Sequence, residues 1–147
     1  MGFVSRNDVS ATTPGFFLNY RGSYLPFKKL VRSFAPGIAS EFYHQASTKN
    51  LIERNIILYP LSINLQNGGY FRFSSSTAYQ FLMEDFVPLG VAIGRGEYRY
   101  LRNALAAGSD PSRKVSFAAT FENGGYYDGN LTSINASINL VPLPQLQ

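Results

Sequence analysis

The sequence predicts an all-β chain, an antiparallel meander of about seven or eight strands that forms part of a transmembrane β-barrel. Residues 131–140 alternate strictly between small uncharged polar side chains and mainly aliphatic ones, and a period of two is typical of a half-buried strand. Residues 70–82 alternate in the same way. Asn67-Gly68, between two strand-like stretches, indicates a β-hairpin.

In the first half of the chain, turn residues separate four predicted strands. These strands cover residues 16–26, 30–35, 38–45 and 55–65. Pro60 lies inside the last of them, and proline is tolerated in a strand only at a sheet edge or a bulge. The following Asn67-Gly68 pair predicts a type I′ turn, because both residues readily adopt positive φ angles.

In the second half, we expect strands over residues 70–82, 97–105, 114–121 and 131–140, with an irregular connection or a bulged strand pair over residues 83–96. The tetrapeptide Asn-Gly-Gly-Tyr occurs twice, at residues 67–70 and 123–126. Both copies lie between strand-like stretches, so a hairpin is expected at each.

Composition bounds the class of protein. The 147 residues form one predicted β domain, residues 1–147, and no stretch is long and apolar enough for a membrane-spanning helix. A membrane-spanning strand needs only about 9–11 residues, so the lack of a long apolar stretch does not exclude a β-barrel. The absence of cysteine excludes thiolate metal sites and disulfides. The 13 Lys and Arg residues are scattered, which argues against a nucleic-acid partner.

The beginning of the sequence has no signal peptide, because no basic region is followed by an apolar core. The pattern of the remaining chain is nevertheless that of an exported barrel. We therefore expect a fragment, an incomplete barrel segment whose N-terminal part is missing.

Several motifs that combine glycine with aromatic or charged residues occur in a fixed order. They lie at residues 2–9, 30–37, 65–69, 84–86, 93–98 and 125–129. In this order they resemble the C-terminal outer-membrane barrel region, of unknown function, of large bacterial proteins with an N-terminal carbohydrate-binding family 9-like domain. The resemblance implies a Gram-negative outer membrane, lipid contact and no known catalytic residue. Carbohydrate would bind only through the upstream domain, which this sequence lacks.

A barrel would place apolar strand faces against lipid and polar residues inside. The predicted lipid-facing residues are Ile57, Tyr59, Leu61, Ile63, Phe71, Phe73, Tyr79, Phe81, Ile134, Ala136, Ile138 and Leu140. The candidate lumen-lining residues are Arg72, Glu97, Arg99 and Arg102. Candidates for the aromatic girdle at the membrane interface are Tyr70, Tyr98, Tyr126 and Tyr127, with Tyr20 and Tyr24.

The sequence predicts no catalytic, metal or cofactor site. His44 is the only histidine, and it lacks the partners that a metal site or catalytic triad needs. Glu97 and Glu122 could meet across neighbouring strands, as the two carboxylates of a glycosidase must. The predicted function is therefore passage or surface display without catalysis.

Two other functions remain open. A soluble β-sandwich or a lipocalin-like ligand-binding module would turn the same apolar faces into a core and leave the arginines in solvent. A carbohydrate-active enzyme built on Glu97 and Glu122 is a more distant alternative.

Overall fold

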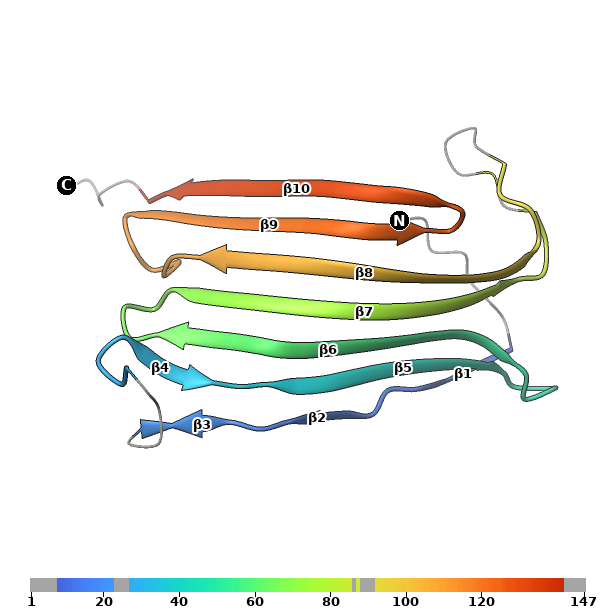
Figure 1. Ribbon diagram of the computed structural model, residues 1–147, viewed down its shortest axis with the longest axis horizontal. Helices are drawn as coiled ribbons and strands as arrows, with labels where there is room; N and C mark the ends of the chain where they lie inside the picture. Colours follow the sequence, from blue (N-terminus) through green and yellow to red (C-terminus); the bar gives the residue numbers. More distant parts are fainter. Residues whose placement is uncertain (1–7, 23–26, 86, 88–91, 142–147) are drawn as a thin grey trace, which may run out of the picture.

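The computed structural model describes residues 8–22, 27–85, 87 and 92–141. These residues form one antiparallel sheet of ten strands and contain no α-helix (Figure 1). The strands are β1 (Val9–Thr12), β2 (Gly15–Phe17), β3 (Tyr20–Arg21), β4 (Val31–Phe34), β5 (Gly37–Gln45), β6 (Leu51–Leu65), β7 (Tyr70–Leu82), β8 (Gly96–Gly108), β9 (Val115–Tyr126) and β10 (Gly129–Leu140). The predicted all-β antiparallel meander is confirmed, and the sheet is open.

The ten strands occupy seven rows. Strands β1, β2 and β3 follow one another along one edge, and β4 and β5 share the next row. Each of β6 to β10 fills a row of its own, with β10 at the opposite edge (Figure 1). Because every pairing is antiparallel, the two edge rows run in the same direction.

Side chains alternate between two faces of the sheet, which we name the apolar face and the polar face. One cross-strand row of the apolar face, from β6 to β10, contains Leu61, Phe73, Leu105, Phe121 and Ile134. The neighbouring row of the polar face, from β7 to β10, contains Ser74, Ala104, Glu122 and Ser133.

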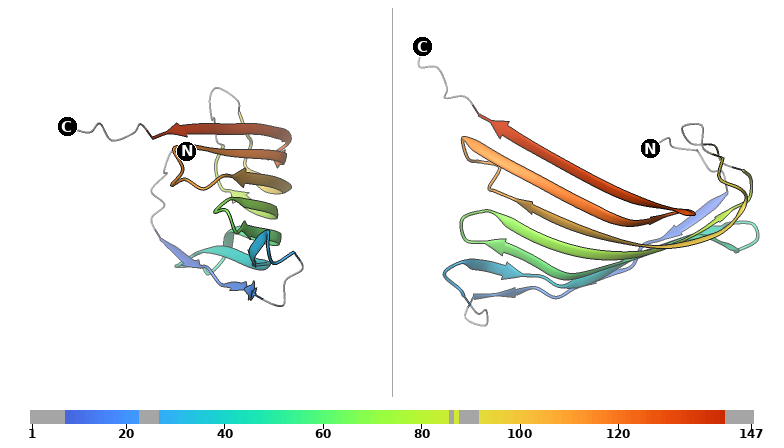
Figure 2. Two further views of the ribbon diagram at one scale, coloured as in Figure 1. Left: turned by 90° about the vertical axis from the view of Figure 1, so that its left-hand side faces the viewer. Right: turned by 45° about the horizontal axis from the view of Figure 1, so that its top comes forward.

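The sheet is curved, and no second layer of described structure covers it (Figure 2). Among the described residues, the only buried hydrophobic side chains are Ile52, Leu82 and Ile93. A β-sandwich needs two sheets packed about 10 Å apart. The described residues therefore contain neither the second sheet nor the core of a sandwich.

The first Asn-Gly-Gly-Tyr copy forms the predicted hairpin between β6 and β7. The Gly68 N–H donates to the Leu65 carbonyl at 3.1 Å, and the Leu65 N–H donates to the Gly69 carbonyl at 2.8 Å. Gly68 has a φ of +83°, whereas Asn67 is not among the residues with positive φ. The predicted type I′ turn is therefore wrong, because that turn needs two residues with positive φ.

The second copy does not form a turn and lies inside β9. The turn to β10 follows it at Tyr127 and Asp128, where Tyr127 has a φ of +55°. Gly124 lies directly against the backbone of Leu101 and Arg102 in β8. The hairpin predicted at residues 123–126 is thus displaced toward the C-terminus, because these glycines serve a close approach between strands.

The register shifts in β6 between Leu58 and Leu61, at the predicted proline bulge. The extra residue reverses the alternation, so that Ile57 lies on the polar face, as does Tyr59. For these two residues the predicted lipid-facing side is wrong. The apolar faces predicted for β7 and β10 agree with the cross-strand register.

The sequence predicts the presence of these strands better than the residues at which they begin and end. Strand β6 begins four residues before the predicted residue 55, and β9 ends five residues after the predicted residue 121. Residues 23–26, part of the first predicted strand, lie outside the described residues, as do Tyr24, Phe86 and residues 2–7 of the resemblance motifs.

Candidate functional site

The apolar face is large and uncovered. Ile134 and Ile138 in β10 are each 74% exposed, and Phe117 and Phe121 in β9 are also exposed. Soluble monomers rarely expose contiguous apolar patches larger than a few hundred Å². An exposed apolar surface that spans five strands is therefore unusual for a soluble monomer.

Strand β7 carries no charged residue on this face between Phe71 and Phe81. The rows of Tyr79 and Phe81 nevertheless contain Arg54, Arg99 and Glu97 of the neighbouring strands. The charge-free rows from Phe71 to Thr77 advance six residues, which is about 16 Å along a barrel axis at about 3.4 Å per residue and a tilt of about 40°. This height is less than that of the outer apolar band of a transmembrane barrel, which is about 25 Å tall.

Charged and aromatic residues border this face at one end. Arg54 and Arg99 lie on either side of Tyr79 in the cross-strand register, and the Arg99 guanidinium carbon is 5.4 Å from the Tyr79 ring centroid. Arg99 also pairs with Glu97 at 3.4 Å, with the two side chains 74% and 55% exposed. This border of the apolar face therefore combines charged and aromatic side chains.

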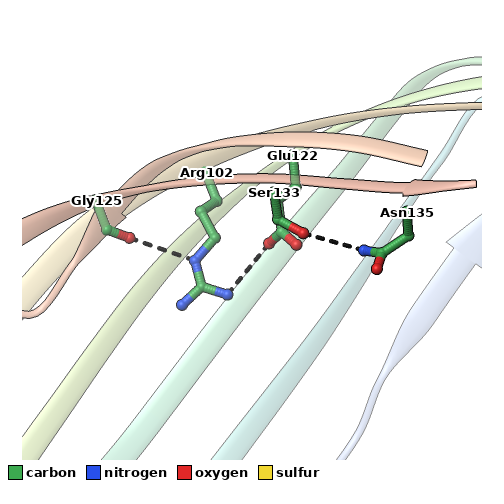
Figure 3. A network of polar contacts seen from close by, with 5 residues as sticks. All are labelled: Arg102, Glu122, Gly125, Ser133 and Asn135. Carbon is green, nitrogen blue, oxygen red and sulfur yellow. Dashed lines mark hydrogen bonds and ion pairs between the residues drawn. The ribbon is translucent and has the colours of Figure 1, made fainter.

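The polar face carries a more shielded ion pair at the centre of a small network (Figure 3). Arg102 Nη1 of β8 lies 3.2 Å from Glu122 Oε1 of β9, and Arg102 Nε donates to the Gly125 carbonyl at 3.3 Å. The two side chains are 21% and 31% exposed. Next to them, Asn135 Nδ2 donates to Ser133 Oγ at 3.0 Å. The network thus ties β8 to β9 on the face opposite the apolar surface.

Tyrosines surround Arg102. Its guanidinium carbon lies 5.1 Å from the ring of Tyr100 and 5.3 Å from that of Tyr126, both within cation–π range. Tyr127 packs edge-on against Tyr98 and Tyr126, at 5.2 Å and 4.8 Å. Desolvation at the turn raises the pKa of Tyr127, and the nearby Tyr126, Tyr100 and Glu53 raise it further. The Tyr127 phenol is therefore a neutral hydrogen-bonding group near pH 7.

The four candidate lumen-lining residues do not share one face. Arg72 and Arg102 lie on the polar face, Arg72 beside the Tyr70 ring at 5.9 Å. Glu97 and Arg99 lie on the apolar face, at its charged border. Arg99 and Arg102 are three positions apart in one strand, and an odd spacing places side chains on opposite faces.

Four of the girdle candidates, namely Tyr70, Tyr98, Tyr126 and Tyr127, lie on the polar face. Tyr126 lies beside Arg102, Tyr127 packs against Tyr126 and Tyr98, and Tyr70 packs against Gly108 and Arg72. All of these contacts are on the polar face, opposite the apolar face on which a girdle next to lipid would lie. The aromatic residues at the charged border of the apolar face are instead Tyr79 and Phe81.

The catalytic alternatives receive no geometric support. Glu97 and Glu122 lie on opposite faces of the sheet, so they cannot flank one glycosidic bond. Among the described residues, no group of His, Asp and Glu side chains could hold a metal ion. His44 lies in β5 between Ser10 and Leu51. The described residues also contain no helix that is long and apolar enough to cross a membrane.

Sequence reasoning missed the central role of Arg102 with Glu122 and Tyr100. The two strands that carry them are separated by a loop, and only the register shows which residues meet. One signal was present: Gly124-Gly125 leaves space opposite two large side chains, and an added Cβ on Gly125 would collide with Tyr100.

Comparison with known proteins identifies no relative. The chain matches no protein-family model, no curated protein and no solved structure.

Proposed function

We propose that this chain is a segment of the wall of a bacterial outer-membrane β-barrel, with a non-catalytic role in passage or surface display. The apolar face contacts lipid, and the polar face lines the interior. The outer membrane and its lipid are the location and partner that fit this arrangement.

One observation carries the proposal: a single curved sheet presents a wide, mainly apolar face, charged only at one border, that nothing in the described structure covers. Burial of such a face is the main favourable term in folding. Lipid supplies that burial for a one-layer sheet, whereas water does not.

The polar face fits a hydrated interior. Its β10 residues are Leu131, Ser133, Asn135, Ser137 and Asn139, which are uncharged and mostly small. One ion pair on this face, Arg102 with Glu122, joins two strands. A surface of this kind allows water and polar solutes to pass and offers no arranged nucleophile, acid or base.

Membrane partition tests the proposal. The chain is expressed with an export signal, and we expect it in the outer-membrane fraction, with migration in detergent gels that changes on heating. Recovery as a soluble monomer without detergent would support the lipocalin-like alternative and contradict the barrel.

A matched pair of substitutions on β10 sharpens this test. Lysine at Ile134 would face lipid and cost about 2–4 kcal/mol near the bilayer midplane, whereas lysine at the neighbouring Asn135 would face the interior at little cost. We expect Ile134→Lys to reduce insertion into lipid vesicles and Asn135→Lys to leave it unchanged. Equal insertion of both variants would remove lipid as the partner of the apolar face.

We also propose, from the resemblance of the sequence motifs alone, that the parent protein carries an upstream carbohydrate-binding family 9-like domain. The genomic sequence on either side of this chain tests it. An upstream region without such a domain would contradict this part of the proposal and leave the barrel proposal intact.

A further inference from the structure

We propose that the free edge of β10 is a strand-addition surface that pairs antiparallel with an uncharged strand from the remaining wall of the same barrel. This inference rests on the proposed function and names the first partner that the barrel wall requires.

The composition of β10 differs from that of a protected edge. Strand β10 pairs with β9 along all twelve residues without a register shift. It contains no charged residue and no proline. Natural edge strands are usually blunted by charges, prolines, bulges or short length. An edge that lacks all four is built to be paired.

The direction of the backbone groups shows which residues need a partner. The Val141 N–H donates to the Lys114 carbonyl of the β9 row at 2.8 Å. Because hydrogen-bonding direction alternates along an antiparallel strand, the odd-numbered residues point toward β9 and the even-numbered ones point outward. The outward set includes Thr132, Ile134, Ala136, Ile138 and Leu140.

These outward residues are also those whose side chains lie on the apolar face. Their N–H and C=O groups have no partner among the described residues and would meet hydrocarbon at a lipid-exposed edge. Unpaired backbone groups do not occur at lipid-exposed edges, which is why membrane sheets close into barrels. In a membrane the β10 edge must therefore be paired.

The opposite edge cannot be that partner in an antiparallel wall. The row of β1, β2 and β3 runs in the same direction as β10 (Figure 1). It is also interrupted between its short strands, and it carries Pro14 and Arg21. Closure with antiparallel pairs alone thus needs an odd number of further strands, the first of them next to β10.

The faces of β10 define the chemistry of that strand. Aliphatic or aromatic side chains are required opposite Ile134 and Ile138, to continue the apolar face. Small uncharged polar side chains are required opposite Asn135 and Ser137, to continue the polar face. A charge opposite the apolar positions would lie in lipid.

Disulfide trapping in detergent micelles tests the proposal. The probe is a peptide that copies residues 115–121 of β9, an uncharged segment that already pairs antiparallel with β10. Two single-cysteine peptides carry Ser116→Cys or Thr120→Cys, and two chain variants carry Asn139→Cys or Asn135→Cys. The chain has no cysteine of its own. We expect disulfides between positions 116 and 139 and between 120 and 135, which would face each other in non-hydrogen-bonded pairs suited to a disulfide.

Two variants of Ala136 control the contact. Ala136→Pro removes an outward N–H and leaves the ladder to β9 intact, so trapping should fall by about fivefold or more. Ala136→Val keeps the N–H and should trap normally. If Ala136→Pro fails to fold, the disulfide pairs formed by the cysteine variants still show whether the peptide adds antiparallel to β10.

The outcomes separate this inference from the proposed function. The expected pairs support the strand-addition surface, whether or not the chain enters lipid vesicles. The swapped pairs, 116 with 135 and 120 with 139, would show parallel addition and overturn it. No adduct in a chain that does insert into lipid would also overturn it. Chain-to-chain disulfides in place of peptide adducts would assign the edge to a second copy and overturn the choice of partner.

Discussion

The tetrapeptide Asn-Gly-Gly-Tyr adopts two different structures in this protein. Residues 67–70 form the turn that joins β6 to β7, where Gly68 has a φ of +83°. Residues 123–126 lie within β9, and the turn follows them. The first copy uses Gly68 for its backbone conformation. In the second copy, Gly124 is needed for the absence of a side chain as well as for its φ of +155°. Identical local sequence therefore does not determine the local structure.

The neighbours of each copy explain the difference. Gly68 lies against the side chain of Asp110, a loop residue that can move. Gly124 lies against backbone atoms of Leu101 and Arg102, which the sheet holds in place. The second copy is thus fixed by a neighbouring strand that the tetrapeptide itself does not encode.

The largest expected effect is at the second copy. Gly124→Ala would place a methyl group into the β8 backbone, and overpacking of this kind costs about 3 kcal/mol. We expect the β8–β9 pairing to weaken and the urea midpoint of the detergent-folded chain to fall. An unchanged midpoint would show that β8 and β9 do not approach as closely as the register requires.

A smaller loss is expected at the first copy. Gly68→Ala forces alanine into the left-handed region, at a cost of about 1–2 kcal/mol, while the Asp110 side chain can move aside. The same urea titration should rank this variant between Gly124→Ala and the wild type. Should Gly68→Ala be the more damaging substitution, the two glycines would have the opposite roles.

The asparagines give a third comparison. Asn67 Oδ1 accepts the Gly69 N–H at 3.0 Å inside a turn, whereas Asn123 Nδ2 donates to Thr132 Oγ1 at 2.8 Å between solvent-exposed side chains of the apolar face. We expect Asn67→Ala to cost about 1 kcal/mol and Asn123→Ala about half as much. Equal unfolding midpoints for the two variants would contradict this distinction.

The smallest effect concerns acid pH at the loop beside the first copy. Hydrogen bonds from the Ser112 hydroxyl and N–H lower the pKa of Asp110 below its ordinary 3.8. A lowered folded-state pKa contributes stability that is present above the ordinary pKa and lost as pH falls through the lowered one. Stability measured from pH 5 downward should therefore decline less steeply in Ser112→Ala. No difference between the two slopes would remove these hydrogen bonds as the cause.

Much of the fold could be predicted because alternation is a local property. Residues 70–82 were predicted as one strand with the bounds that β7 has, since its side chains repeat every second residue. The lumen and girdle candidates were predicted less well. Arg99 and Arg102 were grouped by charge although their spacing separates them, and the tyrosines were placed by strand position although the register turns them toward Arg102.

The sequence by itself determined the all-β class, the hairpin at residues 66–69 and the alternating faces of β7 and β10. These follow from backbone geometry and side-chain period, which each segment carries alone. Only the tertiary structure decided that the bulge at Pro60 places Ile57 on the polar face. It also decided that Gly124 lies against the backbone of β8. It likewise decided that Arg102 meets Glu122 and that β10 is left as an open edge. These facts depend on register between strands, and register is a relation that no single segment contains.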